Sequence, residues 1–262
     1  MQIHLFATDV SALALLDHLS DSDGVTAVMV PSNRKQSEKV AKLETLARQS
    51  GLQVFEHRLQ GKLSAEVPKA DAGISWLYSQ IIAPEDLAKY RLGVLNMHGG
   101  KIPEYRGSSV LHWAIINGER EMGITWHECV AEVDAGPIWE ESVIPIPIDA
   151  TASDMRRAMI EEGVRLFPTA WKRFCDRKDS PRIPEVSIGR IWPRRRREDG
   201  RIGPRWPESK VRDLVRALCP PWPPATIRVN DNWTEIVSVG DKKGPDTIEY
   251  LTADGTILHL QI

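Results

Sequence analysis

The sequence predicts an α/β protein in which helices flank a mostly parallel, Rossmann-like sheet, with a small β-rich appendage at the C-terminal end. Short apolar runs alternate with amphipathic stretches through the first two-thirds of the chain, as they do where strands and helices take turns. Residues 225–262 instead alternate apolar and polar side chains around the turn dipeptide Asp254-Gly255, which is typical of antiparallel strands.

The apolar runs in the first part of the chain are predicted strands, and they occupy residues 2–7, 25–30, 52–57, 72–78 and 93–98. Helices are predicted between the early strands at residues 11–19 and 37–51. The second of these helices ends at Gly51, a residue type that is common at helix ends.

The middle of the chain predicts a short helix, two further strands and a long helix. Residues 108–118 place apolar side chains on one helical face and end at the stop signal Asn117-Gly118. Residues 122–130 and 137–146 have the composition of strands. From Thr151 to Phe174, apolar residues recur at three- and four-residue steps, which predicts a long amphipathic helix.

The composition changes after the long helix. Residues 191–207 are rich in proline, arginine and glycine without periodicity, which predicts a linker with a basic face, and a short helix follows Pro207. We therefore expect a main domain over residues 1–185, a linker with a short helix over 186–224 and an antiparallel appendage over 225–262.

Composition narrows the possible functions. The 34 basic and 36 acidic residues give a formal charge of -2, so the chain as a whole has no attraction for nucleic acid or an anionic membrane. The first residues resemble no signal peptide, and no apolar run is long enough to span a bilayer. The three cysteines are far apart and odd in number, which argues against a disulfide framework and favours the reducing cytoplasm for a soluble protein.

The strongest candidate site follows the strand at residues 93–98. Ligands of open parallel sheets bind beyond the carboxyl ends of the strands, and Asn96 and His98 stand at such an end. Because they are two residues apart, their side chains point the same way. The simpler alternative is that Asn96 caps the strand and His98 satisfies backbone groups, but the glycines and prolines of residues 99–107 indicate a shaped loop.

Two more segments are candidates, and other patterns are weaker. Asp134 lies in the phrase AEVDAGPI, which alone indicates an ordinary turn, and YSQIIAPEDL alone indicates a strand followed by a helix. The sequence has no GxGxxG dinucleotide motif, no phosphate loop and no nucleophile motif, and neither His112 nor His127 has metal-ligand spacing. The run Arg194 to Arg197 is compatible with a phosphate site or with a solvated loop.

These segments together resemble a known family. YSQII, then LNMHGGKIPEYRG, then AIINGEREMGITWHECVAEVDAGPI stand in the order found in the catalytic domain of formyltransferases that use 10-formyltetrahydrofolate. The resemblance is strong over residues 70–145 and weaker through 197–225. It implies that Asn96, His98 and Asp134 form the family's catalytic trio.

The chemistry of the family accounts for these residue types. An amine attacks the formyl carbon and produces an oxyanion, to which Asn96 would donate a hydrogen bond. His98 would accept the proton of the amine, and Asp134 would orient His98. No metal is implied.

The resemblance also implies a folate site. The co-substrate would be 10-formyltetrahydrofolate, with its pterin ring in a slot between two short segments. Their residues are Ser79, Gln80, Ile81 and Ile82 on one side and Val130, Ala131, Glu132 and Val133 on the other.

The acceptor is predicted from the length of the chain. Methionyl-tRNA formyltransferases are similar but have a larger C-terminal barrel, whereas the nucleotide-sugar N-formyltransferases, which serve surface polysaccharides such as the O-antigen of lipopolysaccharide, have a similar length. We expect transfer to the amine of a nucleotide-linked dideoxy amino sugar, with Gly99, Gly100, Lys101 and Arg106 at the sugar.

Several alternatives stay open. The acceptor could be a methionyl-tRNA, the protein could hydrolyse 10-formyltetrahydrofolate with water as the acceptor, or it could bind folate without turnover. The Pro-Ser-Leu-Leu-Pro loop common in the family is replaced here by residues 99–103, and the early glycine-rich phrase of the tRNA enzymes is absent. The sugar enzymes are commonly homodimers, so a homodimer is a possible assembly.

Overall fold

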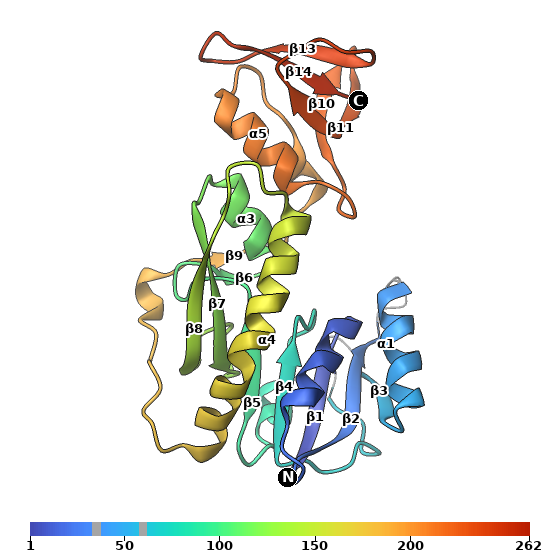
Figure 1. Cartoon of the computed structure of the whole chain (residues 1–262), viewed down its shortest axis with the longest axis vertical. Coiled ribbons are helices and arrows are strands. Elements are labelled where there is room, and N and C mark those ends of the chain that lie inside the picture. Colours follow the sequence, from blue (N-terminus) through green and yellow to red (C-terminus); the bar gives the residue numbers. More distant parts are fainter. Residues whose placement is uncertain (33–37, 58–61) are drawn as a thin grey trace.

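The computed structural model describes residues 1–32, 38–57 and 62–262. A seven-stranded sheet forms its centre, with the strand order β3-β2-β1-β4-β5-β7-β8 (Figure 1). The strands from β1 to β5 run parallel, whereas β7 is antiparallel to both β5 and β8. The strands are β1 (Gln2–Ala7), β2 (Gly24–Pro31), β3 (Gln53–His57), β4 (Ala72–Trp76), β5 (Val94–His98), β7 (Glu121–Glu128) and β8 (Ile138–Pro145). The predicted mostly parallel α/β fold is confirmed.

Helices cover the sheet and form the connections between its strands. The α-helices are α1 (Glu38–Gln49), α2 (Pro84–Leu87), α3 (Val110–Ile116), α4 (Ala152–Asp176) and α5 (Glu208–Ala217). The long helix α4 packs on β5, β7 and β8, and the ring of its Phe167 lies 5.2 Å from that of Trp126 in β7. Thr151 and Asp154 close its first turn in a reciprocal capping box, which fixes where the helix begins.

The helix predicted at residues 11–19 differs in kind. It is a 3-10 helix, η1 (Val10–His18), and its two fully buried residues are Ala12 and Leu15. A 3-10 helix has three residues per turn, so this spacing places both side chains on the side that faces the core.

Short elements connect the linker to the rest of the chain. Strand β9 (Ile191–Trp192) pairs in parallel with β6 (Arg106–Gly107), and the 3-10 helices η2 (Val186–Ile188) and η3 (Arg197–Gly200) lie before and after it. A two-residue pairing has no periodicity, so the sequence alone could not show it. The linker therefore lies against the loop that follows β5.

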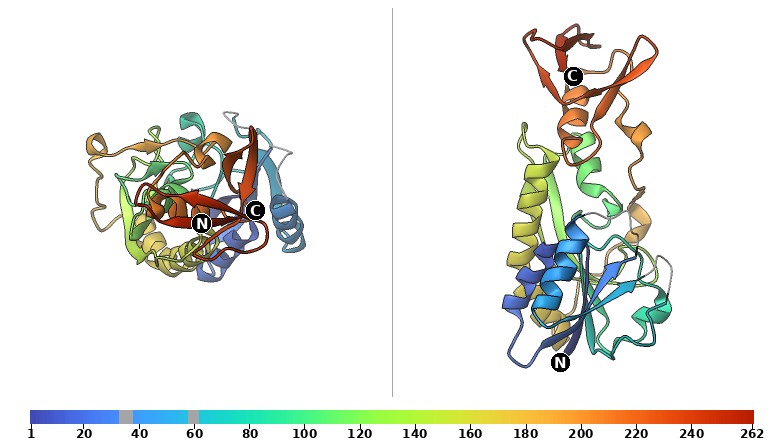
Figure 2. Two further views of the ribbon diagram at one scale, coloured as in Figure 1. Left: turned by 90° about the horizontal axis from the view of Figure 1, so that it is seen from above. Right: turned by 90° about the vertical axis from the view of Figure 1, so that its right-hand side faces the viewer.

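The C-terminal residues form two small antiparallel sheets. One pairs β10 (Ala225–Val229) with β11 (Asn232–Ile236), and the other has the order β12 (Ser238–Gly240), β14 (Ile257–Gln261), β13 (Thr247–Leu251). The predicted antiparallel appendage is thus present. Figure 2 shows these strands at one end of an elongated molecule, with the chain's N-terminus at the other.

Two further findings concern the chain as a whole. All three cysteines are free thiols. Within the described ranges, no helix has both the length and the apolar character needed to cross a membrane.

Candidate active site

Asn96 and His98 occupy the end of β5 in the middle of the sheet. β5 lies between β4, to which it is parallel, and β7, to which it is antiparallel. This antiparallel register places Asn96 opposite His127 and His98 opposite Thr125. His98 is buried, and both predicted residues line the same cleft.

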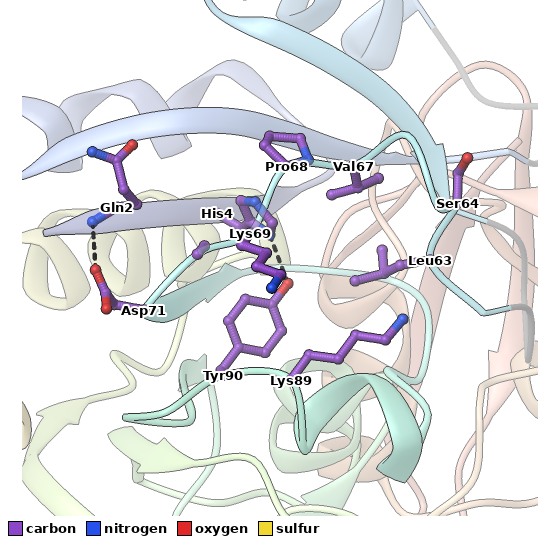
Figure 3. A pocket seen from close by; sticks show the side chains of 11 residues that line it. Gln2, His4, Leu63, Ser64, Val67, Pro68, Lys69, Asp71, Lys89 and Tyr90 are labelled. Carbon is purple, nitrogen blue, oxygen red and sulfur yellow. Dashed lines mark hydrogen bonds between the residues drawn. The ribbon is translucent and has the colours of Figure 1, made fainter.

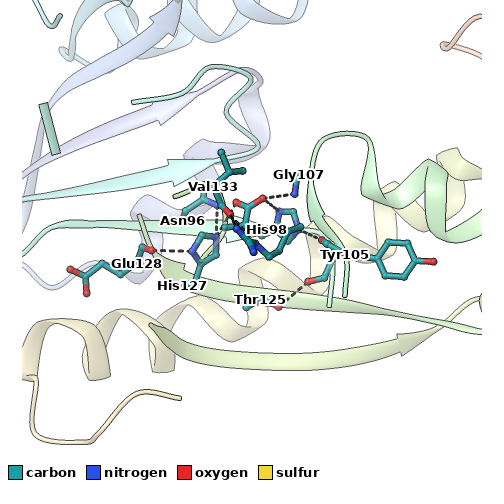
Figure 4. A network of polar contacts seen from close by, with 11 residues as sticks. Asn96, His98, Tyr105, Gly107, Thr125, His127, Glu128 and Val133 are labelled. Atoms are coloured by element: carbon teal, nitrogen blue, oxygen red, sulfur yellow. Dashed lines mark hydrogen bonds and ion pairs between the residues drawn. The ribbon is translucent and has the colours of Figure 1, made fainter. Parts of the chain in front are cut away.

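Asp134 reaches the same point from the loop after β7. Figure 4 shows Asn96, His98 and His127 close together in this polar cluster. One carboxylate oxygen, Oδ2, accepts a hydrogen bond from the Gly107 N–H at 2.7 Å and lies 3.5 Å from Nδ1 of His98. The backbone of Asp134 has φ of 48°, a left-handed conformation that aspartate tolerates better than most residues. Burial alone would raise the pKa of this carboxyl, but His98 and His127 in their protonated forms, together with the Gly107 N–H, hold the pKa well below its usual range. Asp134 is therefore a carboxylate beside the imidazole of His98.

The loop after β5 determines which nitrogen of His98 is available. Nε2 lies 2.6 Å from the carbonyl oxygen of Tyr105, to which it donates its proton. In the neutral ring, Nδ1 then has the free lone pair, and this is the nitrogen that faces Asp134. A Cβ atom at Gly100 would lie 2.4 Å from the Tyr105 oxygen and 2.7 Å from Nε2. Glycine is thus required at position 100 for the carbonyl to approach the ring.

His127 belongs to the same polar cluster, and the sequence did not reveal its place there. Its Nδ1 donates to the Glu128 carbonyl at 3.0 Å, so Nε2 of the neutral ring accepts a hydrogen bond from the Asn96 amide nitrogen, also at 3.0 Å. This contact orients the amide and leaves its second N–H free to donate elsewhere. Asp134 Oδ1 lies 3.4 Å from the same Nε2. The pairing register of β7 with β5 is what brings His127 next to Asn96, and this register cannot be read from a single sequence.

Arg106 and Lys101, predicted at the sugar, lie elsewhere. Arg106 is buried, and its guanidinium donates to the Val133 carbonyl and pairs with Glu132 at 2.6 Å. It therefore fastens the loop that carries Asp134 and is not among the residues that line the cleft. Lys101 lines a separate cavity of about 120 Å³ behind the loop, where its Nζ lies 3.8 Å from Glu121. Of the four residues expected at the sugar, Gly99 lines the cleft.

The cleft has a volume of about 680 Å³, and besides the polar cluster its lining includes two groups of residues, which we call its two arms. One arm lies between the two segments predicted to hold folate, and its lining includes Ser79, Gln80, Ile81, Ile82, Val130, Ala131 and Val133. Ile81 and Val130 are 54% and 40% exposed, so both offer apolar surface to a ligand in this arm. The oxygen Oε1 of Gln80 is buried and has no hydrogen-bond partner among the described residues.

The other arm is bordered by aromatic and basic side chains of the linker. Trp192 stacks on Tyr105 with ring centroids 5.3 Å apart and packs against Trp113 on a neighbouring side. Of the run Arg194 to Arg197, Arg194 lines the cleft, whereas the guanidinium of Arg197 pairs with Glu235 at 3.1 Å.

The fold and the site define an α/β enzyme with an amide, two imidazoles and a carboxylate at the carboxyl end of a central strand. Residues 4–171 match the family described as formyl transferase. This match covers more than half of the chain, and the chain belongs to the formyl transferase family.

Solved structures of sugar formyltransferases share the fold over nearly the whole chain. The N-formyltransferase from Helicobacter canadensis, solved with folinic acid and dTDP-3-aminofucose, is 18% identical with a TM-score of 0.74, over 99% of this chain and 98% of that one. WlaRD, a sugar 3N-formyl transferase solved with dTDP and 5-N-formyl-THF, is 16% identical with a TM-score of 0.75, over 100% and 97%. A 4-N formyltransferase from Francisella tularensis is 17% identical with a TM-score of 0.74, over 90% and 96%.

Proposed function

We propose that this protein transfers the formyl group of 10-formyltetrahydrofolate to the amine of a nucleotide-linked dideoxy amino sugar. The main support is that the two arms, one apolar and one aromatic and basic, line the same cleft as Asn96, His98 and Asp134. A group transfer needs two substrates to meet at one set of reacting side chains, and this cleft has room for that.

The proposed reaction begins when the neutral amine attacks the formyl carbon. Nδ1 of His98 accepts the proton that the amine loses, because Nε2 already donates to the Tyr105 carbonyl. The imidazolium that forms is stabilised by the Asp134 carboxylate 3.5 Å away. The amide of Asn96, held by His127, donates its other N–H to the developing oxyanion. The intermediate then collapses as the carbon–nitrogen bond to folate breaks, and His98 returns the proton to the departing nitrogen.

The apolar arm fits the folate. A flat heterocycle between Ile81 and Val130 would cover two exposed apolar side chains, and the unpaired Gln80 Oε1 would accept a ring N–H. The relatives from Helicobacter canadensis and WlaRD were solved with formylated folates. Glu132, which was also predicted at the folate, pairs with Arg106 and is not among the residues that line the cleft.

The aromatic arm fits a nucleotide. The aromatic side chains of Trp192 and Trp222 give this arm apolar surface for a base, and the guanidinium of Arg194 suits a diphosphate. Two of the similar structures contain dTDP or a dTDP-linked amino sugar. In this assignment Gly99 borders the sugar, and Gly100 and Arg106 shape the site from behind it.

The proposal is tested by incubating the protein with 10-formyltetrahydrofolate and a panel of dTDP-linked 3-amino and 4-amino sugars, followed by mass spectrometry. We expect one added formyl group on one of these sugars and no product with Asn96→Ala. Formate without any formylated acceptor would support a hydrolase instead. Formylation of charged initiator tRNA, with none of the sugars modified, would overturn the proposed acceptor.

A matched pair of variants tests the nucleotide arm. Arg194→Gln should raise the KM for the nucleotide sugar by about tenfold with little change in kcat, because it removes one charge-assisted contact to the diphosphate. Arg197→Gln should leave this KM unchanged, since its guanidinium pairs with Glu235. Equal effects of both substitutions would contradict the placement of the diphosphate at Arg194.

The wider setting is also a proposal. We propose that residues 1–185 form the catalytic domain, 186–224 the linker and 225–262 an appendage through which a cytoplasmic homodimer assembles, and that the product enters surface polysaccharide. The dimer is supported by exposed apolar side chains on the C-terminal sheets, among them Trp233, Leu251 and Ile257. Light scattering tests it, because Leu251→Glu should yield monomers if these strands form the contact.

A further inference from the structure

A second cavity of about 690 Å³ lies apart from the cleft. It opens between the start of β1, the segment before β4 and the turn that follows α2, and none of the residues that line it lines the cleft. Tyr90 belongs both to its wall and to a small buried cluster with Phe6 and Ile82. Because Ile82 lines the cleft, this cluster separates the two cavities.

Two buried polar side chains, His4 and Tyr90, line this cavity, and together they have one hydrogen-bond donor without a well-placed acceptor (Figure 3). His4 is 2% exposed, and its Nδ1 lies 2.8 Å from the hydroxyl of Tyr90. Nε2 of His4 is buried and makes no hydrogen bond of good geometry with any described residue, although the Pro68 backbone lies nearby. Burial lowers the pKa of His4 to about 4, so the ring is neutral at pH 7.

A neutral His4 leaves one donor without a well-placed acceptor in either tautomer. If the tyrosine hydroxyl donates to Nδ1, the proton sits on Nε2, whose nearby acceptor among the described residues is the Pro68 carbonyl, at poor hydrogen-bond geometry. If Nδ1 instead donates to the tyrosine oxygen, the hydroxyl proton of Tyr90 is free. Both arrangements therefore call for an acceptor atom in the cavity.

The charges around the cavity leave one cation unpaired. Asp71 accepts a hydrogen bond from the Gln2 N–H and lies 3.4 Å from Arg91. The ammonium of Lys89 pairs with the buried carboxylate of Asp86 at 2.5 Å. Lys69 has no ion pair with any residue in the part of the chain that the structure describes. The net charge offered to a ligand is thus a single positive one.

The remaining wall is apolar and includes Leu63, Val67, Pro68 and Ala70. Inorganic phosphate would leave this wall in contact with water, whereas a ligand with a hydrocarbon body would cover it. We propose that this cavity binds a small monocarboxylate with an aromatic or branched hydrocarbon body, whose carboxylate meets Lys69 and the His4–Tyr90 pair. Such a ligand matches one cation, one free donor and an apolar surface.

The test uses benzoate as the probe and calorimetric titration of the full-length protein as the measurement. We expect saturable binding that Lys69→Met weakens about tenfold, because the variant keeps the hydrocarbon stem and loses the charge. Tyr90→Phe should weaken binding to a similar degree, since it removes the hydroxyl from the pair. The control Lys242→Met, at an exposed lysine of the C-terminal region, should leave the affinity unchanged.

Competition distinguishes this cavity from the folate slot, where a benzoate ring could also bind. Saturating 5-formyltetrahydrofolate should leave benzoate binding unchanged, and circular dichroism should show each variant folded. Displacement of benzoate by the folate, equal affinity in Lys69→Met and the parent, or tighter binding of inorganic phosphate than of benzoate would each overturn the proposal.

Discussion

Replacing Asp134 by asparagine tests the central interaction of the proposed mechanism. The substitution keeps the size of the side chain and removes its charge 3.5 Å from Nδ1 of His98. At an effective dielectric constant of ~20, two unit charges at this separation attract by about 5 kcal/mol. If the imidazolium is about half formed in the transition state, roughly half of this energy is lost, which lowers kcat on the order of 100-fold.

The measurement is the steady-state rate of formyl transfer at saturating substrates, together with the affinity for 5-formyltetrahydrofolate. We expect kcat to fall while the folate affinity stays within a factor of about two, since the charge acts on the reacting proton. Asp149→Asn, at an exposed carboxylate outside the cleft, serves as the control. A loss of less than about fivefold in kcat, or a parallel loss of folate affinity, would refute the assigned role.

Three further substitutions test other parts of the site and its surroundings. His127→Ala should lower kcat by about ten- to a hundredfold because the Asn96 amide loses the acceptor that orients it, and His127→Asn should restore part of the loss; unchanged kcat in the alanine variant would contradict this. Gly100→Ala should abolish measurable transfer because the added methyl group would force the Tyr105 carbonyl away from His98, whereas Gly24→Ala, with open space around it, should behave as the parent in the same assay. His112→Leu should gain stability over the parent as the pH falls from 7.5 to 5, measured by urea unfolding. Burial, reinforced by Arg195, lowers the pKa of His112 to about 4, so below about pH 6.5 the unfolded chain binds a proton that the folded one does not, and this costs the parent about 2 kcal/mol at pH 5; a stability difference independent of pH would show that this histidine is not the source.

Asp134 also makes the stability of the protein depend on pH, but through a buried carboxylate that is charged in the folded state rather than through a buried neutral histidine. Its pKa in the folded protein lies below the unfolded value of about 3.8, so its contribution is complete above that pH and is lost as the pH falls further. Asp134→Asn should therefore flatten the stability curve below about pH 4.

The sequence predicted those features that depend on neighbouring residues. Apolar runs located the strands from β1 to β5, and the position of Asn96 and His98 at a strand end indicated a site. Asp134 could be assigned only through the resemblance to a family, because no periodicity connects it with β5. Contacts that depend on register and on distant packing escaped prediction. His127 lies opposite Asn96 only because β7 runs antiparallel to β5.

Arg106 shows a second limit of prediction from the sequence, because the surroundings of a charged side chain cannot be read from its residue type. A positive residue in a loop beside a site suggests a ligand contact, yet its side chain is buried against the Val133 carbonyl and Glu132. Charge in a sequence does not reveal whether a guanidinium faces solvent or a neighbouring loop. The position of the linker against β6 was hidden for a similar reason, since two paired residues leave no pattern.

The backbone carbonyl of Tyr105 holds Nε2 of His98, and the ring of the same residue stacks on Trp192 at the edge of the cleft. One residue thus supports both the proposed proton acceptor and a wall of the arm to which we assign the acceptor substrate. A change that reshapes this wall to admit a different substrate would also shift the support of the base. Attempts to engineer substrate choice at Trp192 should therefore select for turnover and for binding at the same time, because both properties depend on the position of Tyr105.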